Sequence, residues 1–513
     1  MTPTAHELRG TQRSPARSGS GVPRSRTKYY LAAVLLLAIV VRVAGLDEQS
    51  LSMDEVAELS IAEGSLSSIL VAHDGFPPLY HFVLHAWSAV FPGDLAARYL
   101  SVLIGALSVG VVWAAAREVG GERIAVWCAV IVALSPFHIW HSQEARAYIL
   151  YYLCAALALY WFIVALKSNS AGAWGSYAAA AWVGLLCHYY FGLLVLTNVC
   201  VALLDWRRLA PHHRLLIAHG ALAVASLPIV WLLLGDLSLE GGVSFPNRVH
   251  LAALGYTLFS FVAGYAVGPS ARELHDMSVG QAISQVLPWL VVTAAAAGVL
   301  LAYGFRVLSP ERWSSRLVLM TLLPVVGAAV AAAALGVTFQ VRHVVWASLP
   351  LMLMLGAGAA EISRRPAIIG PALLGMLLVF GVSRYNRHSL MRYKNEDARA
   401  LAAFLRARDA VSPIFVSTGY MARPIQRYLG DAPAIHSIPD VLPDGTNLTQ
   451  AVGSVERQAP SDAPFWLAYT REFHGDPQGR LLEALRQRYT VTLQATFPGV
   501  RLYRVGPAAT RAQ

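Results

Sequence analysis

Charge is scarce in this sequence. Of its 513 residues only 14% are Asp, Glu, Lys or Arg, whereas a soluble domain carries roughly 25%. Hydrophobic residues make up 56% of the chain, and the mean hydropathy is +0.50. This composition argues against an ordinary soluble domain. It also means that the net charge of +10 is not by itself a sign of nucleic-acid binding.

Cysteine is scarce too, and its four positions lie in or at the ends of apolar runs: Cys128, Cys154, Cys187 and Cys200. Their spacing fits neither a metal site nor a disulfide framework, so we interpret them as small buried hydrophobic residues. The sequence also lacks a glycine-rich phosphate-binding motif on the side predicted to be cytoplasmic. A nucleotide-sugar donor is therefore not indicated.

Long apolar runs are what the sequence has in abundance. A run of about 20 residues suffices to cross the hydrocarbon of a bilayer. We expect about eleven transmembrane helices, near residues 29–46, 96–116, 124–139, 149–166, 174–187, 192–204, 216–234, 286–305, 317–336, 344–360 and 366–382. The predicted fold class is a polytopic α-helical membrane protein with a small C-terminal α/β domain.

Basic residues orient the predicted spans. Seventeen Lys and Arg residues lie in the N-terminal tail and the turns on its side of the membrane. The other side, apart from the C-terminal region, has only Arg98, Arg146, Arg248, Arg272 and Arg342. The positive-inside rule therefore predicts a cytoplasmic N-terminus. Arg42, inside the first span, is expected to snorkel or to pair within the protein.

Three regions follow from this topology. Residues 1–28 are predicted to form a disordered basic cytoplasmic tail, and the run after it a retained helix rather than a cleaved signal peptide. Residues 29–383 form the transmembrane domain. Residues 384–513 alternate strand-like and helix-like patterns and are predicted to be an extracytoplasmic α/β domain. The number of spans is odd, which places residues 384–513 on the outer side, if residues 251–267 are re-entrant or interfacial. If these residues cross the membrane, the number is even and the C-terminal region lies in the cytoplasm.

The first outer loop, about 47–95, holds a carboxylate cluster in "SLSMDEVAELS". On a helix Asp54 and Glu58 would share a face, while Glu55 would point about 100° away. Three further outer loops contain His138, His141, Gln143, Glu144, Arg146 and Tyr148; His188; and Arg342 with His343. The set of His73, Asp74, His81 and His85 in the first loop has no convincing metal spacing.

Each of these residues also has an ordinary structural interpretation. A lone acidic pair usually solvates a loop, arginines at helix ends commonly anchor to lipid headgroups, and single histidines are usually structural. However, two of the five outer basic residues lie beside acidic or histidine partners at helix ends. That concentration favours a site that faces anionic lipid phosphate, for which arginine provides bidentate contacts.

The order of these motifs resembles the GT-C superfamily of membrane glycosyltransferases, particularly bacterial relatives of protein O-mannosyltransferases and aminoarabinose transferases (glycosyltransferase family 39-like). The matching segments, which cover most of residues 29–360, are "MDE", "FPPLYHFVLHAW", "AARYLSVLIGALSV", "HSQEARAYILYYL", "CHYYFGLLVL" and "FQVRHVVWASLP". The C-terminal region resembles the variable extracytoplasmic domain of such proteins. One departure is His343, which follows Arg342 where relatives often have tyrosine.

The resemblance implies transfer of a sugar from a polyprenyl-phosphate donor to an acceptor hydroxyl at the outer face of the cell membrane. It implies a catalytic carboxylate in the first outer loop, which is Asp54, with Glu55 as the next candidate. Inverting transfer needs such a base, and cationic groups for the departing phosphate. We assign the phosphate to Arg342 and Arg146, with His188 in support. Substrate contacts are expected from Glu144, His343, Tyr148, Tyr80 and His81.

The partners implied are the lipid-linked donor, a glycan, lipid or protein acceptor, and the bilayer, with no nucleic acid. No cofactor is specifically implied, although a divalent metal is compatible with the chemistry. Two other classes remain as alternatives. A transporter or flippase would place ionisable residues near the bilayer midplane, often in repeated halves. An assembly scaffold would rest on the C-terminal domain and would leave the outer-loop carboxylates without a role.

Overall fold

The computed structural model describes residues 24–72, 76–240, 251–270, 273–274, 277–336, 339–408, 411–430, 433–460 and 463–507. Its helical body comprises α1 (Arg24–Val43), α2 (Met53–Ala62), α3 (Leu66–Leu70), α4 (Leu79–Val90), α5 (Asp94–Gly120), α6 (Glu122–Leu134), α7 (Pro136–Ser142), α8 (Ala147–Ser168), α9 (Ala171–Leu185), α10 (Phe191–Leu204), η1 (Trp206–Arg208), α11 (His213–Ala225), α12 (Leu227–Glu240), α13 (Leu251–Ala263), α15 (Val279–Leu308), α16 (Trp313–Leu335), η2 (Val341–Ala347), α17 (Ser348–Ile362) and α18 (Pro366–Ser389).

Each of the eleven predicted spans falls on a helix or on a pair of consecutive helices. Within the described residues, six helices are long and apolar enough to cross a membrane, and up to eight spans result if each of two bent pairs counts as one. The chain therefore has the helices of a multi-pass membrane protein. The predicted tail before Arg24 lies outside the described residues. Helix α1 begins at Arg24, and α18 extends to Ser389.

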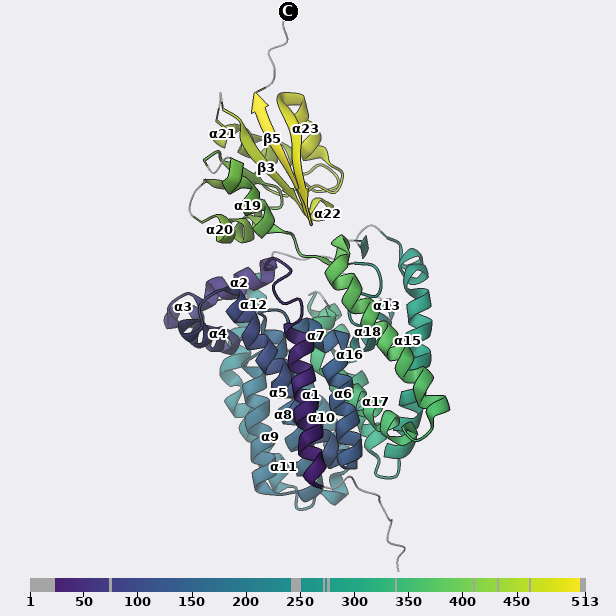
Figure 1. Cartoon of the computed structure of the whole chain (residues 1–513). Helices are drawn as coiled ribbons and strands as arrows, with labels where there is room; N and C mark the ends of the chain where they lie inside the picture. Colours follow the sequence, from purple (N-terminus) through teal and green to yellow (C-terminus); the bar gives the residue numbers. More distant parts are fainter. Residues whose placement is uncertain are drawn as a thin grey trace, which may run out of the picture.

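The helices divide into layers that Figure 1 makes visible. The helices α1, α5, α6, α8, α9 and α10 run side by side, and α15 to α18 pack beside them. The short helices α2, α3 and α4 lie across the upper end of this bundle, opposite the end at which α1 begins. Helix α13 has only 13 residues, about 20 Å of helix, and is too short to cross by itself.

A sharp bend separates α6 from α7, whose axes differ by 61°. Pro136 begins α7 and has no N–H to donate to the carbonyl of Val132, so the end of α6 loses a helical hydrogen bond. Arg42 on α1 supplies the missing donors. Its guanidinium donates to the carbonyls of Val132 (3.2 Å) and Ala133 (3.0 Å), and its Nη2 lies 2.7 Å from Nδ1 of His138.

Arg42 is fully buried and also donates to Ser142 and to the carbonyl of Ala38. It therefore pairs within the protein, one of the two outcomes expected from the sequence. The contacts fix α1 and α7 to the same helix end, which places the loop after α7 at the upper end of the bundle.

The C-terminal region follows α18 and η3 (Met391–Tyr393). Its elements are α19 (Ala398–Arg408), β1 (Ile414–Val416), η4 (Gly419–Met421), α20 (Ala422–Leu429), β2 (Ile435–Ser437), α21 (Leu448–Gln458), β3 (Phe465–Thr470), α22 (Glu472–Gly475), α23 (Arg480–Arg488), β4 (Tyr489–Phe497) and β5 (Val500–Pro507). The strand order is β2-β1-β3-β5-β4, with β2, β1 and β3 parallel and β5 and β4 antiparallel to their neighbours.

The central strands β1 and β3 are buried along their whole length. Alternate side chains enter two cores. Phe415 and Leu467 pack with α21 and α23 on one face of the sheet, whereas Val416 and Trp466 pack with α19 and α20 on the other. Burial on both faces explains why these strands read as continuous apolar runs. The predicted strands and helices of this region are confirmed.

We predict that replacing Arg42 with leucine strongly destabilises the protein. The substitution removes the side-chain donor to the Ala133 carbonyl and leaves the Val132 carbonyl only the 3.3 Å bond from the Ser135 N–H, at a cost on the order of 3–5 kcal/mol. Thermal unfolding of the purified protein in detergent measures the loss. Leu36→Ala, at an outward-facing position of the same helix that is 63% exposed, is the matched control and should change the midpoint little. Equal midpoints for both variants would contradict the role assigned to Arg42.

Candidate functional site

Helix α2 carries the acidic cluster of the segment between α1 and α5. Its N-cap is Ser52, whose hydroxyl accepts from the Glu55 backbone N–H (3.2 Å), while the Glu55 carboxylate accepts from the Ser52 N–H (2.8 Å). This capping box begins the helix at a fixed residue. Asp54 and Glu58 both turn toward Arg146, and Glu55 turns away from it, as the helical spacing predicted.

Glu55 makes a buried ion pair with Arg98 of α5. Two parallel hydrogen bonds of 2.8 Å join the guanidinium to the two carboxylate oxygens, and the Ala145 backbone N–H donates to Oε1 at 3.0 Å. Burial raises the pKa of Glu55, but Arg98 outweighs it and the net pKa is lowered. The same guanidinium donates to the carbonyls of Leu46, Gln49 and Ser50. Glu55 thereby fastens α2 to α5 and to the loop before α8.

Asp54 lies between two arginines from distant parts of the chain. Oδ2 of Asp54 accepts a hydrogen bond from Arg146, at the start of α8, and another from Arg342 of η2 at 2.9 Å. The side chains of Asp54 and Arg342 are 31% and 34% exposed, whereas that of Arg146 is 9% exposed. Asp54 is therefore the carboxylate of this cluster that a ligand can reach.

The two guanidiniums also set the charge state of Asp54. Burial raises its pKa, but Arg146 and then Arg342 outweigh this, and the net pKa lies below the ordinary value. Asp54 is consequently ionised at neutral pH. The surroundings contain two cations for one accessible carboxylate, which suits an additional anionic ligand such as a phosphate.

Glu58 continues the same face of α2 into the interior. Its Oε1 lies 3.7 Å from Nε of Arg146, and its Oε2 lies 2.7 Å from Nε2 of His81 on α4. Both side chains are almost completely buried, and the neighbouring Tyr80 is fully buried. His81 thus pairs with Glu58 in the interior, and Tyr80 is buried beside it on α4.

Aromatic rings line the arginines on the side away from α2. The guanidiniums of Arg146 and Arg342 lie 4.9 and 5.7 Å from the centre of the Tyr148 ring. His188 stacks on Tyr151 with ring centres 4.8 Å apart, and its ring centre lies 5.6 Å from that of His343. The Tyr151 hydroxyl donates to the His343 carbonyl (3.1 Å), which helps to hold η2 and Arg342 in place.

Several buried polar atoms around Asp54 have no hydrogen-bond partner among the described residues. They are Nε of Arg342, Oη of Tyr148, Nε2 of His188 and Nδ1 of His343. Native interiors leave few polar atoms unsatisfied, so a cluster of them indicates a place where a ligand or water binds. Burial, followed by His343 and the two arginines, lowers the pKa of His188, so its ring is neutral at pH 7. The cluster is therefore built of neutral donors and acceptors beside two cations.

Glu144 contacts Arg146 through the backbone: the Arg146 N–H donates to the Glu144 carbonyl at 2.9 Å. In the described chain no side-chain hydrogen bond or ion pair joins the Glu144 carboxylate to Arg146, so the expected role in orienting that arginine or contacting the sugar stays a prediction. Glu144 lines a small separate cavity with Arg98, Gln143 and Arg387. Burial raises the pKa of Glu144, with partial compensation by Arg387.

Two further expectations concern metals and histidines. His73 and Asp74 lie outside the described residues, and His85 binds the carbonyl of Ala62 through Nδ1 at 2.7 Å, which is a structural contact. No group of three or more His, Cys, Asp or Glu residues in the described ranges is arranged to hold a metal ion. Around Asp54 two arginines face the carboxylates of Asp54 and Glu58, and the partly exposed cation is Arg342, which suits an anionic ligand.

Sequence reasoning missed part of this arrangement. Arg98 was counted only as an outer basic residue, and its pairing with Glu55 was not foreseen. Glu58 was recognised as sharing a face with Asp54 but was not assigned a role. The i, i+4 spacing of the two acids opposite one arginine was a usable signal. The contact with Arg98 had no signal in the sequence, because 43 residues separate the partners.

The C-terminal region docks on the segment that leads into α2. Ser50 donates to Asp397 (2.5 Å) and accepts at its carbonyl from Asn395 (3.0 Å), and the Leu51 N–H donates to the Tyr428 hydroxyl (2.9 Å). At the far end of α2, Arg427 pairs with Glu63 at 2.9 Å. The C-terminal region thus holds both ends of the helix that presents Asp54.

Part of the chain matches a known protein family. A family model described as dolichyl-phosphate-mannose-protein mannosyltransferase matches residues 76–231. No curated protein matches the chain in sequence. Among solved structures, ArnT from Cupriavidus metallidurans in the apo state has a TM-score of 0.55 at 14% identity, covering 93% of this chain and 98% of that chain.

Two ligand-bound structures are also similar. ArnT bound to undecaprenyl phosphate gives a TM-score of 0.52 at 14% identity, covering 94% of this chain and 98% of that chain. The archaeal oligosaccharyltransferase AglB from Archaeoglobus fulgidus, in complex with an inhibitory peptide and a dolichol-phosphate, gives 0.51 at 13% identity, covering 95% and 75%. At such identities the likeness establishes the fold. The resemblance to the GT-C superfamily that the motifs indicated is therefore confirmed.

The two adjacent carboxylates of α2 should respond differently to neutralisation. We expect Glu55→Gln to cost on the order of 3 kcal/mol, because it leaves Arg98 buried without its counter-charge. Asp54→Asn should stay within about 1 kcal/mol of the wild type, since the Asp54 site is partly exposed. Thermal unfolding of both isosteric variants in one detergent makes the comparison. A lower unfolding midpoint for Asp54→Asn than for Glu55→Gln would contradict the assignment of Glu55 as the structural carboxylate and Asp54 as the carboxylate that a ligand can reach.

Proposed function

We propose that the protein is a membrane glycosyltransferase that moves a sugar from a polyprenyl-phosphate donor to an acceptor hydroxyl, with Asp54 as general base. One observation carries this proposal: a partly exposed carboxylate held by two arginines, surrounded by unsatisfied polar atoms, in a GT-C fold. Solved proteins of this fold bind undecaprenyl phosphate or dolichol-phosphate, which supports a lipid-linked donor here.

The reaction would proceed as an inverting displacement. The acceptor oxygen attacks the anomeric carbon and loses its proton to Asp54, while the bond from that carbon to the phosphate oxygen breaks. The bonding electrons leave with the polyprenyl phosphate, whose negative charge Arg342 and Arg146 stabilise. Tyr148, His188 and His343 offer unsatisfied polar atoms to the sugar and the phosphate.

Donor binding would also tune the base. In the described structure both arginines depress the pKa of Asp54, and a strongly depressed carboxylate is a weak base. A donor phosphate that engages the guanidiniums offsets their charge and shifts the pKa of Asp54 upward. Asp54 would thus gain basicity when the donor is bound. The arrangement disfavours Glu55 as the base, because Arg98 and Ala145 already occupy its oxygens.

The topology forms part of the same proposal. Eleven spans with a cytoplasmic N-terminus would place the Asp54 site and residues 384–513 outside the cytoplasm, at the plasma or inner membrane. The site and the C-terminal region lie at one end of the bundle, and α1 begins at the other, which is consistent with this orientation (Figure 1). An outer site suits a sugar carried on a lipid and destined for a glycan, lipid or protein of the cell envelope, and a hexosyl or pentosyl donor fits equally.

Asp54→Asn should lower sugar transfer by about 10²- to 10⁴-fold, the usual contribution of a general base. The assay follows release of labelled sugar from synthetic polyprenyl-phosphate mannose, glucose, galactose, arabinose and aminoarabinose by purified protein. Asp47→Asn, an exposed acid in the same loop, is the matched control and should retain activity. Near-normal transfer by a folded Asp54→Asn protein would show that another group is the base.

Removal of Arg342 should change the pH dependence of the reaction. Arg342→Gln takes away one of the two charges that lower the pKa of Asp54, so that pKa should rise. The base works as a carboxylate, and activity is lost as pH falls through its pKa. The acid limb of the pH–rate profile should therefore move to higher pH, accompanied by a higher KM for the donor. An unchanged acid limb of the pH–rate profile would show that Arg342 does not set the pKa of Asp54.

A further inference from the structure

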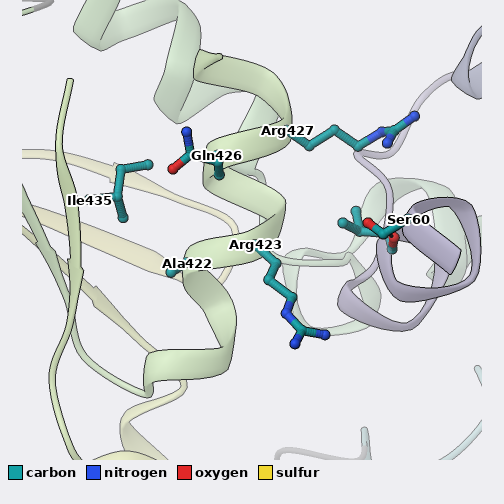
Figure 2. A pocket seen from close by; sticks show the side chains of 7 residues that line it. Ser60, Ala422, Arg423, Gln426, Arg427 and Ile435 are labelled. Atoms are coloured by element: carbon teal, nitrogen blue, oxygen red, sulfur yellow. Dashed lines mark hydrogen bonds between the residues drawn. The ribbon is translucent and has the colours of Figure 1, made fainter. Parts of the chain in front are cut away.

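A second cavity lies on the other side of α2, between the helical body and the C-terminal region. It has a volume of about 380 Å³ and is lined by Val56, Ser60, Ala422, Arg423, Gln426, Arg427 and Ile435. Figure 2 shows Arg423 and Arg427 reaching from α20 toward α2, with Ser60 opposite them. We call this cavity the α2–α20 groove. Its size falls within the range of small-ligand sites.

The groove offers polar groups of several kinds beside apolar ones. Arg427 is neutralised by Glu63 and Asp94, at 2.9 and 2.7 Å. Arg423, one helical turn earlier, is exposed and makes no ion pair or hydrogen bond with the residues that the structure describes. Ser60 adds a hydroxyl group, and Val56 and Ile435 add aliphatic surface. A free guanidinium with hydroxyl and aliphatic neighbours suits the hydroxyl-rich faces of a sugar.

The groove and Asp54 share helix α2. Ser60, which lines the groove, follows Asp54 by six residues, about 9 Å along the helix axis. Beyond Arg423 the C-terminal region continues with Tyr420, whose ring lies 5.4 Å from the guanidinium of Arg471. Arg471 is close enough to Asp54 to contribute to the lowering of its pKa. Tyr420 and Arg471 thus place an aromatic ring and a cation of the C-terminal region near Asp54.

We propose that the α2–α20 groove binds a saccharide unit of the acceptor, with Arg423 and Ser60 as hydrogen-bonding residues and Tyr420 as an aromatic surface near Asp54. The inference rests on the proposed glycosyltransferase function and assigns the acceptor to the class of glycans or glycolipids. The C-terminal region then contributes one wall of the acceptor site, and α2 contributes the other wall as well as the base.

Saturation-transfer NMR with the full-length protein in detergent tests the groove. The probes are the methyl glycosides of mannose, glucose, galactose and arabinose at millimolar concentration. Arg423→Ala removes the free donor and should weaken binding about tenfold, and Ser60→Trp should abolish it by filling the groove. The matched controls are Arg486→Ala on α23 and Ser67→Trp on α3, both exposed positions remote from the groove, and both should bind as the wild type does.

The outcomes separate this inference from the function itself. Saccharide binding that Ser60→Trp and Arg423→Ala lose, and that Asp54→Asn retains, supports the groove even if no donor is cleaved. Asp54-dependent donor cleavage together with unchanged glycoside binding in both groove variants leaves the function standing and overturns the groove. Absence of binding of all four glycosides to the wild type overturns it as well.

Discussion

The ion pair between Glu55 and Arg98 is the contact on which the rest of the site depends. It lies in the interior, where both charges are satisfied by each other, by the backbone N–H of Ala145 and by carbonyls of the loop before α2. These bonds join α2, α5 and the residues just before α8 in one place. Because Arg146 follows Ala145 directly, the pair that orients α2 also delivers an arginine to Asp54.

Asp54 can be reached by a ligand because it is less buried than Glu55. Glu55 has both oxygens engaged in the interior, whereas Asp54 is partly exposed and shares Oδ2 between two guanidiniums. Arg146 also has Glu58 within 3.7 Å, so the partly exposed guanidinium of Arg342 is the cation that an incoming anion can reach. Unsatisfied atoms of Tyr148, His188 and His343 lie beside it. The site is therefore organised for an anionic, hydroxyl-bearing ligand before one arrives, which reduces the reorganisation that binding requires.

The C-terminal region holds helix α2 in place, a role that no pattern in its sequence indicates. Asn395, Asp397 and Tyr428 bind the segment before α2, and Arg427 holds the other end of that helix. A ten-residue helix has little stability of its own and depends on such contacts. The sheet of the C-terminal region is thus coupled mechanically to the carboxylate, although the two are far apart along the chain.

The apolar runs of the sequence were sufficient to predict the long helices of the body, and its alternating patterns predicted strands and helices in the C-terminal region. Apolar runs in a bilayer must satisfy their backbone internally, so run length and composition determine a helix with little help from tertiary contacts. Tertiary structure decided which of the two adjacent carboxylates is accessible to a ligand. Asp54 and Glu55 have the same chemistry and differ by about 100° around α2. What faces each of them comes from Arg342, 288 residues from Asp54, and from Arg98, 43 residues from Glu55. No local pattern records such separations, because the packing of distant helices sets them.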